Sequence, residues 1–289
     1  MKHAFLIIAH NKYNQLQKLI NLLDDKRFDI YIHIDKKSEL PILYSLNANL
    51  HILNNRIDVR WGDLSQIRCE LALFEYASSK YTYEYYHLIS GIDLPIKTND
   101  YIINFFEQNK GKEFINFVDE TNYVQKRIGR YILGTRFFRP TTFLEQVFNY
   151  LFRTIQPIID IFYKKNLTNI EYKMGANWVS VTHDFCKFLI SNKCHILKKY
   201  KHTLCADEIY KQTLCWNSRF RNNIFDLHHG YRGCVRLIDW VRGNPYVWGA
   251  DLERDKKIIS KSGAIFIRKI DLDKYPDFVC FIEKSILKT

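Results

Sequence analysis

The chain has 289 residues, a formal net charge of +12 at pH 7, 47% apolar residues and 26% charged residues. Its length suits one large α/β domain, and these proportions are those of a soluble globular protein rather than a disordered one. The surplus of Lys and Arg predicts a positive surface for phosphate-bearing ligands, anionic lipids or nucleic acid. Composition alone leaves all three open.

Cysteine content and hydropathy bear on the compartment. The seven cysteines include no C-x-x-C pair, which argues against a disulfide framework or a zinc site and favours a reducing compartment. The N-terminal MKHAFLIIAH is too short for a signal peptide, and no stretch reaches the roughly 20 apolar residues of a membrane span. We therefore expect a cytoplasmic protein, with the inner face of the membrane as the alternative location.

From the N-terminus, short apolar runs alternate with helical patterns. Strands are predicted at residues 4–9, 29–34, 50–53, 85–89 and 113–118, and helices at 13–23 and 64–78. This order predicts a parallel sheet, and such a sheet binds ligands at the carboxyl ends of its strands. His10 and Asp35 stand directly after the first two strands. The chain is thus predicted to begin with a nucleotide-binding α/β half.

A basic amphipathic stretch occupies residues 141–165, where Pro157 is expected to kink or break any helix. Two interpretations are open: a core helix with a solvated cationic rim, which we favour, and a helix lying on a membrane surface. Further on, residues 178–182 are predicted to form a strand, and 184–191 and 206–217 to form helices.

Four motifs follow one another along the chain: HIDKKSE at 33–39, SGIDLPIKTN at 90–99, DEIYKQTL at 207–214 and FIRKID at 266–271. IIAHNKYNQL precedes them, and GANWVSVT lies among them. With these motifs in this order, the chain resembles the core-2/I-branching β-1,6-N-acetylglucosaminyltransferase family, glycosyltransferase family 14, which also includes peptide O-xylosyltransferases. The chain looks like a bacterial-type member.

The resemblance implies a single GT-A-type (Rossmann-like) domain over residues 1–289, an α/β fold whose mixed central sheet is flanked by helices. Residues 1–118 would form the nucleotide-sugar-binding half, and residues 119–289 the acceptor-binding and catalytic half. It also implies an inverting transfer from a UDP-sugar, with N-acetylglucosamine or xylose as the sugar.

Glu208 matches the family's catalytic base. An inverting transfer needs a carboxylate that takes the proton from the acceptor hydroxyl as this attacks the anomeric carbon. Glu208 would lie in the first turn of a predicted helix, where the helix dipole favours the ionised form. The residues alone favour another role, in which Asp207 and Glu208 only cap this helix. The resemblance reverses that preference.

The resemblance also implies that no metal ion is needed, because fixed cations neutralise the departing diphosphate. Arg268 and Lys269 match the family's basic pair, and Arg242 matches an upstream arginine more loosely. Solvated surface charges are the alternative for all three. The Asp-x-Asp string at 271–273 is interpreted as unrelated to metal binding, since it lies far from the strand end where such motifs occur in this fold. We expect no cofactor.

Donor recognition is expected from His10, Asp35, Trp61 and Asp93. Asp35 could accept hydrogen bonds from uracil or ribose. Trp61 matches an aromatic residue that the family places against the uracil ring, and core packing is its alternative role. Asp93 lies in the turn where donor sugar and acceptor should meet, although an Asp in such a turn often only satisfies its own backbone.

For the acceptor, Asp119, Arg127 and Arg130 match, by spacing alone, residues that hold the acceptor sugar in branching enzymes. The chain lacks the amino-terminal anchor and paired cysteines of animal members, which suits a cytoplasmic enzyme of bacterial surface polysaccharide synthesis. Its acceptor would be a glycan or a lipid-linked glycan. A lipid-linked acceptor would explain a peripheral membrane contact of residues 141–165.

Two other functions are open at this point. The charge and aromatic content allow nucleic-acid binding, but the sequence has no zinc finger, RNP or helix-turn-helix signature, and we expect no nucleic-acid partner. A catalytically silent carbohydrate-binding relative would carry the same motifs.

Overall fold

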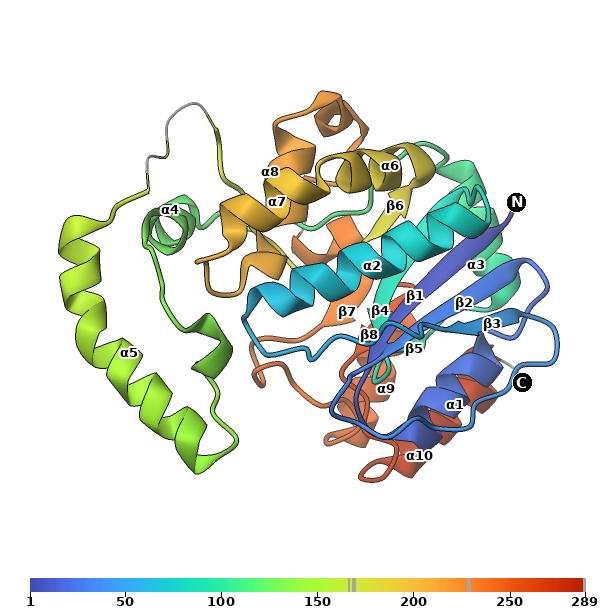
Figure 1. Cartoon of the computed structure of the whole chain (residues 1–289). Coiled ribbons are helices and arrows are strands. Elements are labelled where there is room, and N and C mark those ends of the chain that lie inside the picture. Colours follow the sequence, from blue (N-terminus) through green and yellow to red (C-terminus); the bar gives the residue numbers. More distant parts are fainter. Residues whose placement is uncertain (166, 168–169, 228–229, 288–289) are drawn as a thin grey trace.

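The computed structural model describes residues 1–165, 167, 170–227 and 230–287, and a five-stranded sheet runs through its centre (Figure 1). The strands, in spatial order, are β3 (Asn49–Ile52), β2 (Phe28–Ile34), β1 (His3–Ala9), β4 (Tyr85–Ser90) and β6 (Ser180–Thr182). The first four are parallel, and β6 is antiparallel to β4. Every residue of β2 and β4 is buried, as expected for a sheet covered on both faces. The predicted mixed α/β sheet is confirmed.

Helices cover the two faces of this sheet. On one side pack α2 (Leu64–Lys80), α6 (His183–Ser191), α7 (Lys193–Tyr200) and α8 (Tyr210–Trp216). On the other side pack α1 (Tyr13–Leu22), α3 (Asn99–Gln108), α9 (Leu252–Lys261) and α10 (Pro276–Phe281). Successive strand residues point to opposite faces, so Ala4 and Leu6 join the first core and Phe5 and Ile7 the second.

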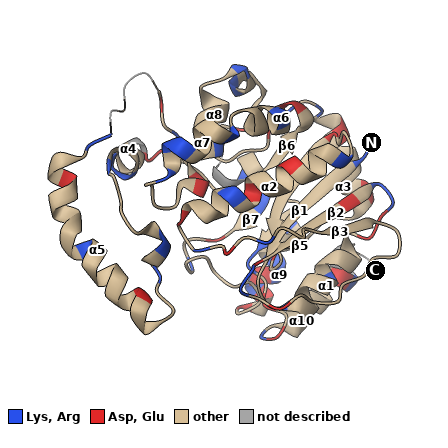
Figure 2. Cartoon of the chain, viewed as in Figure 1, with Lys and Arg blue, Asp and Glu red and all other residues tan. Residues whose placement is uncertain are grey.

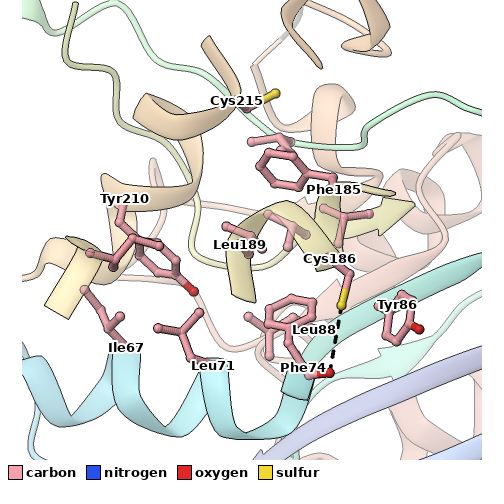
Figure 3. Packing of buried hydrophobic residues seen from close by; sticks show 14 of the residues in the cluster. Ile67, Leu71, Phe74, Tyr86, Leu88, Phe185, Cys186, Leu189, Tyr210 and Cys215 are labelled. Atoms are coloured by element: carbon pink, nitrogen blue, oxygen red, sulfur yellow. Dashed lines mark hydrogen bonds between the residues drawn. The ribbon is translucent and has the colours of Figure 1, made fainter. Parts of the chain in front are cut away.

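The first core is built largely between α2 and α6. Figure 3 shows Leu71 and Phe74 of α2 beside Leu189 and Cys186 of α6, and the Cys186 thiol lies 3.8 Å from the Phe74 carbonyl oxygen. Each fully buried apolar side chain of this size contributes about 1.5–3 kcal/mol. Asp63 begins α2 by accepting a hydrogen bond from the Ser65 N–H at 3.0 Å.

A second, three-stranded sheet lies at the carboxyl end of the first. Its strands are β5 (Leu94–Pro95), β8 (Phe266–Arg268) and β7 (Arg236–Ile238), with β8 in the middle. β5 continues directly from the turn after β4, and its pairing with β8 brings Arg268 beside that turn. Strands from before and after residue 118 therefore combine in both sheets.

Short elements complete the chain. They are α4 (Thr121–Gly129), the 3₁₀ turns η1 (Thr135–Phe137), η2 (Ala206–Glu208), η3 (Arg219–Asn223) and η4 (Gly230–Cys234), and a terminal π-helical turn η5 (Ile282–Leu287). No helix in the described part of the chain is long and apolar enough to cross a bilayer.

Two predicted elements differ from the structure. Residues 113–118 form isolated bridges rather than a strand, because Glu113, Phe114 and Val118 each pair with a different segment. The predicted helix at 206–217 is divided at Ile209 into η2 and α8. The Gly175 N–H binds the Glu208 carbonyl oxygen at 2.9 Å, which takes this carbonyl out of a continuous helix.

The amphipathic stretch forms α5 (Phe143–Phe162), which stands at the edge of the molecule in Figure 1. None of its residues is buried, so the favoured prediction of a core helix is wrong. Pro157 was predicted to kink or break the helix, and the break does not occur, because the helix continues through this residue. Proline removes a single N–H, and on an exposed helix water can solvate the carbonyl that loses its partner.

Candidate active site

Three of the predicted donor residues, His10, Asp35 and Asp93, follow strands of the central sheet at their carboxyl ends. His10 follows β1, and Asp35 follows β2. The pKa of His10 is lowered, first by partial desolvation and then by nearby cations that include Arg268 and Lys269, while Asp35 opposes the shift. Two strand ends and the basic pair at the end of β8 therefore share one electrostatic environment.

Arg268 is held in place by the turn after β4. Its Nη1 lies 2.7 Å from a carboxylate oxygen of Asp93, which is fully buried. The other Asp93 oxygen accepts the Ser90 N–H at 2.8 Å, and the Ser90 hydroxyl also contacts Arg268. The guanidinium lies 4.4 Å from the centre of the Trp178 ring. Asp93 thus binds its own turn, as the alternative interpretation stated, and also positions Arg268.

Lys269 is half-buried, and no ion pair joins it to a carboxylate within the described ranges. Its pKa is lowered, first by desolvation and then by the neighbouring Arg268 and Arg139, with Asp93 opposing. A desolvated cation surrounded by other cations is stabilised by a bound anion. This geometry suits a phosphate group.

Arg139 connects the two sides of the site, and the motifs did not identify it. Its guanidinium carbon lies 3.6 Å from the centre of the Trp61 ring. Arg139 lowers the pKa of Lys269 on one side. On the other side it opposes the rise in the pKa of Cys205, which burial, Asp207 and Glu208 raise to about 12. The sequence signal would have been the run of aromatic residues before Arg139.

Trp61 is 44% exposed, so it is not a core residue as its alternative role required. Phe138 stacks on it at 5.7 Å, and Arg139 covers part of one ring face. The loop that carries Trp61 is fixed by Asp35, whose buried carboxylate accepts the N–H groups of Lys37 at 2.8 Å and Val59 at 3.2 Å. Protein groups therefore already bind both oxygens of Asp35.

Glu208 lies in η2, one turn before α8, with 35% of its side chain exposed. Arg127 of α4 donates to its carboxylate at 2.9 Å. The Arg127 guanidinium lies 4.5 Å from the centre of the Tyr123 ring. Glu208 therefore presents a carboxylate that is both accessible and paired with a partly buried cation.

The neighbouring Asp207 is neither accessible nor paired with Arg127. It is buried, and burial, then Glu208 and Glu70, raise its pKa to about 8. Lys211, fully buried beneath it, lies 2.5 Å from Glu70 and 3.0 Å from the Asp207 carbonyl oxygen. Of the two adjacent acids, Glu208 is the one that a ligand can reach. Asp207 belongs to a buried polar network.

The sequence matches the family model described as Core-2/I-Branching enzyme over residues 3–269. The chain belongs to the Core-2/I-branching enzyme family. It is 23% identical over 265 residues to Xylosyltransferase oxt of Drosophila pseudoobscura pseudoobscura, with 84% of this chain and 28% of that protein aligned. Xylosyltransferase sqv-6 of Caenorhabditis briggsae is 24% identical over 266 residues, with 83% and 31% aligned. Xylosyltransferase 2 of Rattus norvegicus is 21% identical over 252 residues, with 83% and 26% aligned.

This membership confirms the resemblance drawn from the motifs and the GT-A-type architecture. The matched model is that of branching enzymes, and the three named relatives are xylosyltransferases. The chain spans 26% to 31% of the length of these curated relatives.

Three further predicted site residues of this branching-family chain are ion-paired or exposed. The Arg242 guanidinium lies 3.9 Å from the centre of the Tyr246 ring, and the Tyr246 carbonyl oxygen accepts the Lys269 N–H at 3.4 Å, so Arg242 borders the basic pair. Arg242 pairs with Asp239 at 2.5 Å and with the buried Asp255 at 2.8 Å. Arg130 pairs with Asp160 of α5 at 2.6 Å, and Asp119 is exposed. Of the three predicted acceptor residues, the structure brings only Arg127 to Glu208.

The Asp-x-Asp string of this family member has a protein partner. Asp271 pairs closely with Lys12, and Asp273 lies 3.5 Å from the same ammonium. Within the described ranges, no group of three or more His, Cys, Asp or Glu side chains is arranged to hold a metal ion.

Proposed function

We propose that this chain transfers a sugar from a UDP-sugar to a hydroxyl of a glycan acceptor, with inversion at the anomeric carbon and without a metal ion. Glu208 is the base, and Arg268 and Lys269 bind the diphosphate. The observation that supports this most is the position of Arg139, which is within electrostatic range both of Lys269 and of Cys205 beside Glu208. The proposed base and the proposed phosphate site thus border one region.

In the reaction, the acceptor hydroxyl oxygen forms a bond to the anomeric carbon from the face opposite the diphosphate. Glu208 takes the hydroxyl proton, and the bond between the anomeric carbon and the phosphate oxygen breaks with its electron pair going to the diphosphate. Lys269 and Arg268 neutralise the charge that develops there. Asp93 and Trp178 hold Arg268 in position, so little reorganisation is needed during transfer.

Arg127 forms an ion pair with one carboxylate oxygen of Glu208 in the free protein. An incoming hydroxyl would take over one oxygen of this carboxylate, while the other stays bound to Arg127. Arg127 thereby orients the base toward the acceptor. This role replaces a direct contact with the acceptor sugar as the main function of Arg127.

His10, Asp35 and Trp61 would form the nucleoside end of the donor site. The Trp61 ring offers a stacking surface for uracil, and Asp35 fixes the loop before it. Xylose is one candidate sugar because the named relatives are xylosyltransferases, and N-acetylglucosamine is the other because the family model is that of branching enzymes. The acceptor would be a glycan or lipid-linked glycan of bacterial surface polysaccharide synthesis, at the cytoplasmic face of the membrane.

A donor screen tests this proposal. Hydrolysis of UDP-N-acetylglucosamine, UDP-xylose and other UDP-sugars is measured in EDTA, together with the melting temperature in the presence of UDP. We expect slow hydrolysis of one donor and stabilisation by UDP, both unchanged by EDTA. Strict dependence on manganese would contradict the role of the basic pair. Stabilisation by UDP-sugars without turnover, with or without acceptor glycans, would indicate a catalytically silent relative.

A further inference from the structure

The helix α5 contacts the rest of the protein through several polar side chains and through Phe152, whose ring stacks on Phe137 at 5.8 Å. Glu145 pairs with Arg60 at 3.0 Å, near the start of the helix. Gln156 bonds to the backbone of the segment before η1, donating to the Tyr131 carbonyl oxygen at 3.1 Å. Asp160 pairs with Arg130 near the end of the helix. These inward-facing side chains recur at helical spacing along one side of α5.

The opposite side of α5 is apolar and largely faces solvent, with the Phe148 ring at its margin 5.2 Å from Phe137. Seven apolar side chains form a stripe at spacings of three and four residues: Leu144, Val147, Phe148, Leu151, Ile155, Ile158 and Phe162. Their exposed fractions range from 40% to 73%. At 3.6 residues per turn, the centre of this stripe lies roughly 130° around the helix from the polar contacts. A surface helix normally buries its apolar side and exposes its polar side. The exposed apolar stripe of α5 therefore indicates a binding surface.

Basic residues are numerous in the segments next to α5. Between residues 121 and 165 there are eight Lys and Arg and two Glu and Asp, so half of the net charge of +12 lies in this short part of the chain. Figure 2 shows that α5 itself is nearly free of charge and that the basic residues lie mainly on the neighbouring segments. An apolar stripe with a basic margin is the pattern of a helix that lies in the interface of an anionic membrane.

A cavity at the carboxyl end of α5 is also lined by basic residues. It has a volume of about 560 Å³, and its lining includes Lys126, Arg130, Lys164 and Lys165. The one acidic residue in the lining, Asp160, is already paired with Arg130. Lys165 binds the Thr203 hydroxyl at 2.8 Å. The lysines around this open cavity are suited to phosphate headgroups beside the apolar stripe.

We propose that α5 docks this protein on an anionic lipid bilayer, with the apolar stripe inserted among the acyl chains and the surrounding Lys and Arg side chains on the lipid phosphates. The helix lies in the plane of the membrane and does not cross it. This docking depends neither on the identity of the donor sugar nor on Glu208 being the base. It would hold the active site near acceptors that are themselves attached to lipid.

Flotation of the full-length protein with vesicles tests the docking. We expect the protein to float with phosphatidylcholine vesicles that contain about 30 mol% phosphatidylglycerol, to float much less with phosphatidylcholine alone, and to be released by high salt. The double variant Leu151→Glu/Ile158→Glu should bind anionic vesicles at least about tenfold more weakly, since it places two carboxylates in the stripe. The variant Lys126→Glu/Lys164→Glu should lose mainly the preference for anionic lipid.

The matched control is Ile42→Glu/Leu46→Glu in the loop between β2 and β3. These apolar side chains are 98% and 86% exposed, and the control should float like the unaltered protein. Equal melting temperatures of all variants show that each is folded.

Three results would overturn the proposal. They are failure of the unaltered protein to float with anionic vesicles, equal flotation of the Leu151/Ile158 variant, and a concentration-dependent dimer in light scattering that this variant abolishes. The last would identify a second copy of the chain as the partner of α5.

Discussion

Arg127 of α4 donates a hydrogen bond to the carboxylate of Glu208 at 2.9 Å, across 81 positions of sequence. This contact joins a helix of the predicted acceptor region to the predicted catalytic base. Because the Glu208 side chain is still 35% exposed, the contact orients the carboxylate without closing it off.

Removing the charge of Glu208 should abolish transfer while leaving the donor site intact. The Glu208→Gln variant keeps the shape and can still bond to nearby groups, but it cannot accept the acceptor proton. We expect kcat to fall by ~10²–10⁴-fold with unchanged affinity for UDP, measured by steady-state kinetics and calorimetry. Glu253→Gln, at a surface ion pair with Lys256, is the control and should be fully active. Normal turnover by Glu208→Gln would remove the base from the scheme.

Arg127 and Arg130 were predicted together as acceptor residues, and the structure separates them. Arg127→Ala should lower kcat/KM for the acceptor by about 10–100-fold, because an oriented charge-assisted hydrogen bond to the base is lost. Arg130→Ala removes only an exposed ion pair with Asp160 and should have a small effect. Equal losses in the two variants would argue for a shared contact with the acceptor instead.

Lys269→Ala should weaken binding of UDP more than binding of uridine. A lost charge-assisted contact to phosphate corresponds to about a 10–100-fold change in Kd, which calorimetry resolves. Lys257→Ala on the exposed side of α9 is the control of equal charge and should leave both affinities unchanged. If Lys269→Ala weakens UDP and uridine equally, the lysine does not act on the diphosphate.

The buried Asp207 predicts how stability depends on pH. Burial, then Glu208 and Glu70, raise its pKa to about 8, so the folded protein holds this proton more tightly than the unfolded chain. The stability that Asp207 contributes is therefore greatest below its unfolded pKa of about 4 and is lost as the pH rises toward 8. Asp207→Asn stays neutral. It should raise Tm by at least about 2 °C at pH 8 and bring little gain at pH 5.

Asp24 provides a control, because its pKa is shifted in the opposite direction from that of Asp207. Burial works against ionisation there, but hydrogen bonds from the Ser45 hydroxyl and the backbone at 46–48 lower its pKa to about 2. Its contribution is present above pH 4 and is lost as the pH falls toward 2. Asp24→Asn should therefore lower Tm at pH 8. Parallel pH profiles for the unaltered protein and both variants would contradict the assignments.

The sequence was sufficient for features that follow from local pattern. His10 and Asp35 stand after two apolar strands of a βαβ unit, so their position at one edge of the sheet was predictable. A motif match predicted Glu208 as the base, and the structure adds that its side chain is partly exposed while Asp207 is buried. Motifs mark residue types in order, but they do not give burial.

Features that depend on tertiary contacts could not be predicted. The amphipathic pattern of α5 indicated a helix with two sides, but periodicity does not say which side faces the protein, and the core-helix prediction failed for that reason. The motif match gave the residue type of Arg242, but its ion pairs with Asp239 and Asp255 depend on the fold. Arg139 belongs to none of the motifs and reaches the site only through the fold.

The most direct test of the central claim is a crystal structure of the protein with UDP, grown in EDTA. We expect the diphosphate to lie against Arg268 and Lys269, without a metal ion, and the Glu208 carboxylate to face the same cleft on the side where an acceptor enters. A diphosphate bound away from these two cations, or a Glu208 side chain directed outside that cleft, would contradict the account.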